Sequence, residues 1–289
     1  MTLSVVIITH NEEANLARTL ESVKPLVADG KGEIIVVDSG STDRTVEIAK
    51  SYDAKVFVEE WKGYAAQKNS AIDKAMGDWI LSLDADEEVE SGLAGEIFGA
   101  MHGLSIAEED GSLIHGGSLE IVEAALAAED LERRGIPSAF SVPRKNHFLG
   151  RWIKHGGFWP DPKLRLFRKG VARFEYRLVH EDAKLTDGIS GNLGHALLHH
   201  SYPTLSDYID HMNRYSSLGA EMAVAKGAGG FSIFNIVVRP LATFIYNYLF
   251  RLGFLDGREG LLLHLYHAVY VSWKYAKAWE LSRNSPRRH

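Results

Sequence analysis

The chain has 289 residues, 45% hydrophobic and 24% charged, so it can bury one large core or two modest ones. A net charge of −6 and a pI near 6.1 argue against nucleic acid as the main partner, because no overall basic surface is available for phosphates. Cysteine is absent, which excludes disulfides, thiolate zinc sites and cysteine nucleophiles.

The first third of the chain alternates between strand-like and helix-like segments. Residues 3–9 form a β-branched run typical of a buried parallel strand; without a basic segment before it or a small-residue cleavage site after it, it does not look like a signal peptide. A helix capped by Asn11 should follow, and further strands are expected at 33–38, 55–58 and 79–83, with helices at 42–51 and 65–76. This order predicts an α/β fold with a mostly parallel sheet and a ligand site at the carboxyl ends of its strands.

Three polar clusters directly follow predicted strands, at residues 9–12, 38–43 and 84–87. Because the carboxyl ends of parallel strands meet at one edge, we expect the clusters to converge there. Asp84 and Asp86, one residue apart, can direct oxygens to a shared point and so suit a divalent cation, Mg²⁺ or Mn²⁺. We predict Asp86 as the direct ligand and place Asp84 nearer a ribose, or at the metal through water. Such a metal would neutralise a leaving diphosphate.

Asp38 has two interpretations. Its carboxylate can accept hydrogen bonds from a nucleoside while Ser39 and Gly40 let the backbone approach closely, or it can simply close an Asx-type turn at the strand end. One turn can serve both purposes.

Four ordered motifs carry a family resemblance: residues 4–12 (SVVIITHNE), 36–43 (VVDSGSTD), 67–69 (QKN) and 83–87 (LDADE). Together they resemble the nucleotide-binding half of the family 2 glycosyltransferases. The residues of these motifs are similar to those of the lipopolysaccharide-core β-1,4-glucosyltransferase branch. The resemblance implies a GT-A fold, a UDP-sugar donor, a divalent metal and inversion at the anomeric carbon.

The resemblance also implies roles for individual residues. Thr9, Asn11 and Glu12 would line the uracil pocket, and Asp38 with Ser39 would contact the nucleoside. Asp84 and Ala85 would lie on the donor side. Lys68 would lie near the base or diphosphate, unless it is a solvent-facing helix lysine.

An inverting transferase needs a general base for the acceptor hydroxyl. Residues 179–181 (VHE) resemble the family's strand-end carboxylate motif, so Glu181 is the predicted base. Asp182 is its competitor, and a salt bridge from Glu181 to Arg165, Arg168 or Arg173 is the structural alternative.

Residues 143–160 interleave aromatic and basic side chains, a composition that suits sugars and the phosphates of a lipid acceptor. The predicted acceptor or phosphate contacts are Arg144, Arg151, Trp152, His155 and Arg165. His199 or His200 is a candidate further metal ligand, with a purely structural role as the alternative for both.

Two regions extend beyond the motifs. Residues 102–137 are an expected insertion into a catalytic domain of residues 1–203, with a helix at 119–133. Residues 204–289 form a predicted amphipathic helical region in which residues 231–255 are apolar and aromatic but interrupted by Arg239, Pro240 and Arg251. This pattern favours helices lying on an anionic membrane surface over a transmembrane span, with a packing domain or dimer interface as the alternative.

The sequence therefore predicts an inverting, metal-dependent hexosyltransferase. It would move a hexose, glucose by resemblance, from a UDP-sugar to a glycolipid such as the lipopolysaccharide inner core, on the inner face of the cell membrane. A sugar nucleotidyltransferase is one alternative, although residues 9–12 lack the glycine-rich basic loop such an enzyme needs. A non-catalytic glycan-binding protein is the other. The oligomeric state is not readable.

Overall fold

The computed structural model describes residues 1–103, 135, 137–175 and 182–284. The chain forms two compact units. The first contains the described parts of 1–144, 162–175 and 182–199, and the second contains 145–161 and 200–284. The division after residue 199 lies close to the predicted boundary at 203, whereas residues 145–161, part of the predicted catalytic domain, belong to the second unit.

A seven-stranded sheet forms the centre of the first unit, in the order β12-β6-β9-β4-β1-β2-β3. β1 (Leu3–Thr9), β2 (Gly32–Asp38), β3 (Lys55–Val58) and β4 (Trp79–Asp84) run parallel. β9 (Lys163–Arg168) is antiparallel to β4 and to β6 (Ala139–Val142), and β12 (Ser190–Asn192) runs parallel to β6. The predicted mostly parallel α/β sheet is therefore present.

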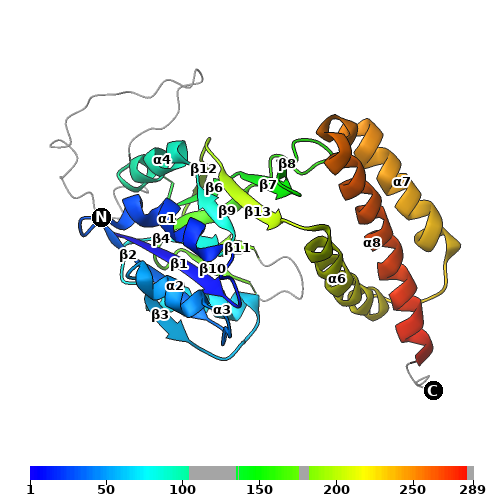
Figure 1. Cartoon of the computed structure of the whole chain (residues 1–289), viewed down its shortest axis with the longest axis horizontal. Helices are drawn as coiled ribbons and strands as arrows, with labels where there is room; N and C mark the ends of the chain where they lie inside the picture. The colour runs from blue at the N-terminus through cyan, green and yellow to red at the C-terminus, as the bar shows by residue number, and fades with distance from the viewer. Residues whose placement is uncertain (104–134, 136, 176–181, 285–289) are drawn as a thin grey trace. The chain divides into compact units, whose positions relative to one another are not determined.

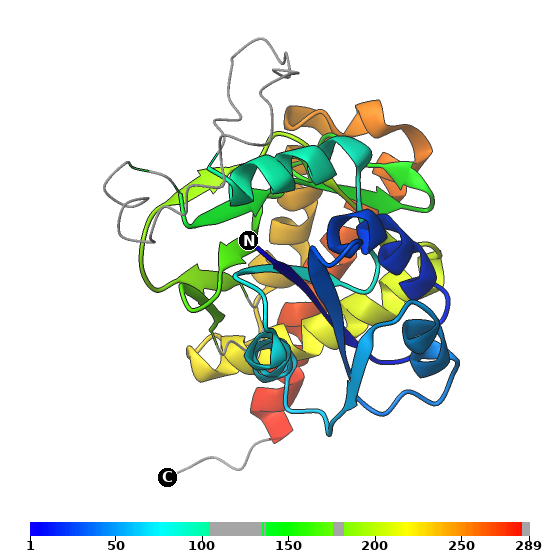
Figure 2. The same cartoon turned by 90° about the vertical axis from the view of Figure 1, so that its left-hand side faces the viewer.

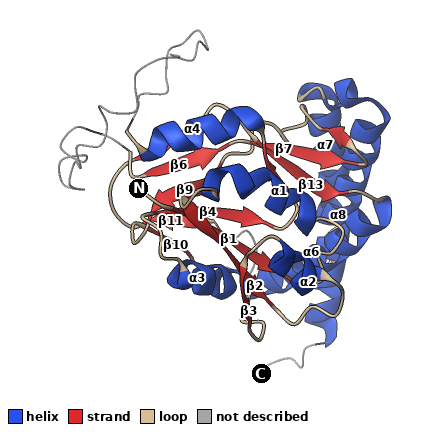
Figure 3. Cartoon of the chain, turned by 60° about the vertical axis from the view of Figure 1, so that its left-hand side comes forward, coloured by secondary structure: helices blue, strands red, loops and turns tan. Residues whose placement is uncertain are grey.

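Helices cover both faces of this sheet, because alternate strand residues point to opposite sides. α1 (Leu16–Val27), α2 (Thr45–Ser51) and α4 (Ser91–Met101) share a core with the odd-numbered residues of β1. α3 (Tyr64–Lys74) and the hairpin of β10 (Ala172–Phe174) and β11 (Ala183–Leu185) pack on the other face. Figure 3 shows α1 and α4 on one side of the strands and α3 on the other.

The predicted cap of the first helix is wrong. α1 begins at Leu16 with Asn15 before it, and Asn11 instead adopts a left-handed backbone with φ of 56°. Asn11 Oδ1 accepts a hydrogen bond from the Thr42 amide at 2.9 Å, so its side chain joins two loops of the sheet edge. Asparagine tolerates this conformation better than most residues, which explains why the capping signal misled.

One strand passes from the first unit into the second. β13 (Leu197–Tyr202) pairs antiparallel with β5 (Glu87–Val89) through its first half. This pairing brings His199 opposite Glu87.

The second unit contains a short hairpin, coloured green, and helices, coloured yellow to red in Figures 1 and 2. β7 (Arg144–Phe148) pairs with β8 (Arg151–Trp152), and α6 (Leu205–Ala225) starts at a capping box between Thr204 and Asp207. A helical rod follows, made of the π-helical turn η2 (Phe234–Val238), α7 (Arg239–Ile245) and the π-helical turn η3 (Tyr246–Phe250). The 3-10 turn η4 (Gly253–Asp256) leads into α8 (Gly257–Asn284).

Pro240 explains how the rod is fastened to α8. A proline has no N–H for the carbonyl four residues earlier, which here belongs to Ile236. The Ser272 hydroxyl of α8 donates to that carbonyl at 2.7 Å, so the group left free by the proline is satisfied by the neighbouring helix.

Among the described helices, none combines the length and the apolar composition that a membrane span requires.

Candidate functional site

The three polar clusters meet at the carboxyl edge of the parallel strands, as expected. Thr9 pairs in register with Asp38, and Ile8 pairs with Asp84. The Thr9 hydroxyl donates to Asp38 Oδ1 at 2.9 Å, which joins the ends of β1 and β2 directly.

Asp38 is buried and used by the chain itself. Its Oδ2 accepts from the amides of Gly40 at 2.9 Å and Ser41 at 2.8 Å, and its Oδ1 also accepts from the Ser41 hydroxyl. This is the Asx-type turn of the structural interpretation. The neighbouring Ser39 hydroxyl, by contrast, is buried without a hydrogen-bond partner among the described residues. Both carboxylate oxygens of Asp38 therefore already accept hydrogen bonds, whereas the Ser39 hydroxyl can still form one with a ligand.

Asn11 and Glu12 lie at the same edge, and Asn11 is exposed there. The Glu12 amide donates to the Thr45 hydroxyl at 2.7 Å, and its carboxylate accepts from Asn15. Burial raises the pKa of Glu12, and the negative charges of Asp86, Asp43 and Asp84 raise it further. The carboxylates from the β1, β2 and β4 loops are thus close enough to repel one another.

Asp84 is held between two cations. Lys68 Nζ lies 2.5 Å from Asp84 Oδ1, and an Arg165 guanidinium nitrogen lies 2.5 Å from Oδ2. Burial favours the neutral acid, but the charges of Arg165 and Lys68 outweigh it and hold the pKa of Asp84 well below its usual range. The solvent-facing alternative for Lys68 is wrong, since its side chain is buried beside Asp84 and over the Phe174 ring.

Sequence reasoning missed the part played by Glu87. It is fully buried, accepts from the Asp84 amide at 2.9 Å, and lies 2.6 Å from Arg165 and 3.1 Å from Arg144. Arg144 and Arg165, predicted for the acceptor side, are therefore inner members of an ion network with Asp84. The only sequence signal for Glu87 was its place at the end of the 84–87 cluster.

Asp86 lies beside His199, with 3.4 Å between Oδ2 and Nε2. Burial raises the pKa of Asp86, yet His199 more than compensates, and the net shift is downward. His200, the next residue of β13, instead stacks on His147 with ring centroids 5.2 Å apart. Of the two candidate histidines, the structure brings His199 to the acidic cluster. Ala85 is buried, and its carbonyl accepts from Thr19 at 2.7 Å, which fixes the loop between the two aspartates.

The donor set fits an open metal site. A carboxylate oxygen and an imidazole nitrogen suit Mn²⁺ better than Mg²⁺, which takes oxygen ligands almost exclusively. Within the described ranges, no three histidine, aspartate or glutamate side chains form a cage. Two protein ligands would leave positions for diphosphate oxygens and water.

The predicted base lies outside the described residues, because residues 176–181 are not described. Its competitor Asp182 is exposed and forms an ion pair with Lys163 at 2.9 Å. The helix predicted at 119–133 and the basic tail near residue 287 also lie outside the described part.

The remaining predicted acceptor residues belong to the second unit. Trp152 lies under the ammonium groups of Lys145 and Lys154, 5.1 and 4.4 Å from its ring centroid. Arg151 lies 3.7 Å from Glu259. His155 is bound to the buried Asp256, with 3.0 Å between Nδ1 and Oδ1, so its ring has a structural partner.

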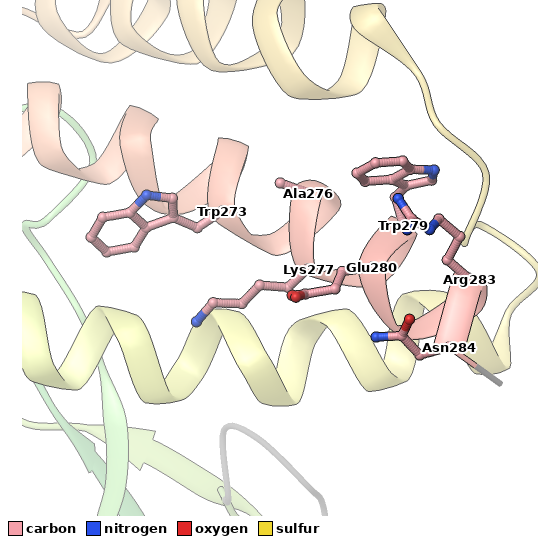
Figure 4. Close-up of a pocket in the computed structure, with 7 residues that line it drawn as sticks. All are labelled: Trp273, Ala276, Lys277, Trp279, Glu280, Arg283 and Asn284. Atoms are coloured by element: carbon pink, nitrogen blue, oxygen red, sulfur yellow. The ribbon is translucent and has the colours of Figure 1, made fainter.

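The second unit also has a groove along α8, of about 410 Å³. Its lining lysine, Lys277, reaches toward α6 and donates to Asn213 and Ser216 (Figure 4). Among described residues the lining comes from α8 alone: Trp273, Ala276, Lys277, Trp279, Glu280, Arg283 and Asn284. None of these belongs to the acidic cluster, and we assign the lysine a helix-packing role.

The fold and cluster define an α/β protein with an acidic, cation-lined site at the carboxyl edge of a parallel sheet. Residues 4–104 match the model of glycosyl transferase family 2. An uncharacterized glycosyltransferase of Rickettsia typhi is 30% identical, with 98% of this chain and 88% of the relative covered. The lipopolysaccharide core biosynthesis glycosyltransferase LpsC of Rhizobium meliloti is also 30% identical, covering 96% of this chain and 92% of LpsC.

A solved structure is similar over a shorter region. It is glucosyl-3-phosphoglycerate synthase from Mycobacterium tuberculosis in complex with Mn²⁺, UDP and glucosyl-3-phosphoglycerate, at 32% identity. The similarity covers 30% of this chain and 34% of the synthase with a TM-score of 0.28, which is too low to support an argument. The two nearly full-length relatives decide the assignment: the chain belongs to glycosyl transferase family 2, and its sheet is the GT-A type predicted from the motifs.

Proposed function

We propose that the protein is an inverting, metal-dependent transferase that moves a hexose, glucose in the first instance, from a UDP-sugar to a membrane glycolipid. The observation that carries this proposal is the pairing of Asp86 with His199 at the strand edge, beside an Asp84 already neutralised by cations. In a family 2 glycosyltransferase, this geometry leaves Asp86 and His199 to hold the metal.

The residues divide the chemistry between them. Bound Mn²⁺ or Mg²⁺ would supply positive charge to the diphosphate leaving group. Lys68 and Arg165 keep Asp84 ionised and in place, where it would accept a hydrogen bond from a ribose hydroxyl or reach the metal through water. Ser39 offers the nucleoside a hydroxyl that has no partner in the described part of the chain, and the exposed Asn11 and half-buried Glu12 would line the uracil site at the same edge.

Glu181 is the proposed base. It takes the proton of the acceptor hydroxyl as that oxygen bonds to the anomeric carbon, and the bond from this carbon to the β-phosphate oxygen breaks. UDP leaves with the bonding electrons, and the new bond lies on the opposite face of the sugar. The ion pair with Lys163 makes Asp182 the weaker candidate.

Two observations support the acceptor class: the similarity to LpsC, named for lipopolysaccharide core biosynthesis, and the apolar rod of the second unit. The rod leaves large apolar side chains outward at helical spacing: Phe234, Val237, Val238, Leu241, Ile245 and Leu249. Such a stripe suits the interface of a bilayer. The nucleotide donor puts the reaction on the inner face of the cell membrane.

Asp86→Ala should abolish metal-dependent UDP binding, because one of the two proposed ligands is lost. Calorimetry with and without Mn²⁺ measures this, and Asp187→Ala, which removes an exposed carboxylate of the same unit, is the control. Undiminished Mn²⁺-dependent affinity in Asp86→Ala would reject its role as ligand.

Glu181→Gln should leave UDP affinity unchanged and reduce turnover by roughly 10²–10⁴-fold, the usual contribution of a general base. Turnover is followed as glucose transfer from UDP-glucose to a core glycolipid, and NMR of the product gives the anomeric configuration. Near-normal turnover in Glu181→Gln, together with collapse in Asp182→Asn, would move the base to Asp182. Retained configuration would reject the inverting mechanism.

A further inference from the structure

The tip of the rod combines apolar and basic side chains. From the end of η3 through η4, five large apolar residues are 44–75% exposed: Leu249, Phe250, Leu252, Phe254 and Leu255. Lys154, Arg251 and Arg258 are exposed around them, and none has a carboxylate partner within 4 Å in the described part of the chain.

The acidic residues near this tip are already engaged. Residues 231–265 contain two, Asp256 and Glu259. Asp256 is buried, and Glu259 lies 3.7 Å from Arg151. The exposed charge of the tip is therefore positive.

The tip is also joined to the 154–157 loop. Asp256 accepts from the amides of Lys154 at 3.2 Å and His155 at 2.8 Å, and the Gly156 amide donates to the Arg251 carbonyl at 2.8 Å. A Cβ on Gly156 or on Gly253 would lie 2.0 and 2.3 Å, respectively, from the buried His264 ring. Close backbone packing thus holds Lys154 and Arg251, far apart in sequence, at one junction.

We propose that this tip, Leu249–Leu255 with Lys154, Arg251 and Arg258, binds the phosphates of anionic lipids in a bilayer. The apolar side chains enter the acyl boundary while the cations reach the phosphate plane, as long basic side chains do at interfaces. The inference deepens the proposed function and rests on it for the membrane location of the acceptor. Through Asp256, the tip sets the 154–157 loop at a fixed depth relative to the lipid headgroups.

The positive charge of the tip favours a bilayer over a second copy of this chain as its binding partner. In a symmetric contact a second copy would bring the same three cations, which have no carboxylate partner among the described residues, against one another, whereas a phosphate-rich surface neutralises them. Each basic residue near such a surface strengthens binding about fivefold, so two contribute about 30-fold.

The test is co-flotation of the full chain with phosphatidylcholine vesicles, with and without phosphatidylglycerol. The variant is Arg251→Gln/Arg258→Gln, and the matched control is Lys31→Gln/Lys226→Gln, which removes two exposed cations elsewhere. We expect wild type and control to bind the phosphatidylglycerol vesicles equally and the tip variant about 30-fold more weakly. Equal binding to both vesicle types, or equal loss in variant and control, would overturn the proposal.

Two further experiments distinguish the bilayer from other binding partners of the tip. Inorganic phosphate that binds as tightly as the anionic vesicles, and is lost in the tip variant, would make the tip a soluble-phosphate site and overturn the bilayer assignment. A lipid-free dimer abolished by Phe250→Ser would assign the tip to a second copy instead. UDP titration of the wild-type protein keeps the tests distinct. Wild type that binds UDP but not the anionic vesicles rejects the tip alone, and wild type that binds the vesicles but not UDP rejects the transferase.

Discussion

At the scale of single residues, the site depends on charges that neutralise one another. Arg165 is buried between Asp84 and Glu87, and Glu87 depends on it most because water does not reach that fully buried carboxylate. Removing one partner of a buried ion network leaves uncompensated charge, whereas an exposed pair contributes little. Arg165 thus acts as a positioning residue for Asp84.

Arg165→Met should lower the free energy of unfolding by about 3–5 kcal/mol, the typical cost of breaking a buried pair. Urea denaturation measures it. Arg44→Met, which breaks an exposed pair with Glu47, is the matched control and should leave the urea midpoint close to that of the wild type. Equal effects in the two variants would mean that the network around Asp84 does not hold the edge together.

The same scale shows where sequence reasoning stops. The acidic residues past each strand were predictable, since strand ends mark the ligand edge of a parallel sheet. The partners of Asp84 were not predictable. Arg165 is 81 residues away in the sequence, and its burial depends on tertiary packing. Asp38 and Asn11 were predicted as donor-site residues. Their hydrogen-bond partners, however, are set by backbone turns that the local sequence indicates only weakly.

At the scale of elements, strand and helix order in the first third was predictable from apolar periodicity. The assignment of residues 145–161 to the second unit was not predictable. It depends on contacts with residues about 100 positions later, such as that of His155 with Asp256. The packing of α8 on these loops leaves His264 buried, and burial lowers its pKa to about 4, with His267 adding to the effect and Asp256 opposing it.

His264 should make stability depend on pH. Its folded pKa lies below the unfolded value of 6.5, so between pH 6.5 and 4 the unfolded chain binds a proton that the folded chain does not. The free energy of unfolding should therefore fall as pH falls through this window, by about 3 kcal/mol in total. Urea denaturation at pH 7 and pH 4.5 should show the fall in wild type and a much smaller one in His264→Leu. Parallel curves would place the titration elsewhere.

At the scale of the whole molecule, the two units divide the work. The first carries the acidic cluster, and the second carries the apolar rod, the basic tip and the aromatic loop around Trp152. The rod leaves Leu241 and Leu249 more than half exposed, an arrangement that water alone would not favour for so many neighbouring side chains.

Leu241→Glu/Leu249→Glu should reduce flotation with anionic vesicles, because two charges would have to enter the apolar boundary. UDP affinity should not change. Met76→Glu, at an exposed apolar position of the first unit, is the control and should float like wild type. Unchanged flotation of the double variant would show that the rod does not face the bilayer.

The proposed activity requires that the strand edge bind a UDP-sugar through a metal. Calorimetric titration of the purified protein with UDP, once with Mn²⁺ and once with a chelator, measures this binding. We expect micromolar binding with Mn²⁺ and at least a tenfold loss, about 1.4 kcal/mol, with the chelator. Absence of binding in both conditions would contradict the donor assignment, and equal binding in both would contradict the metal role of Asp86 and His199.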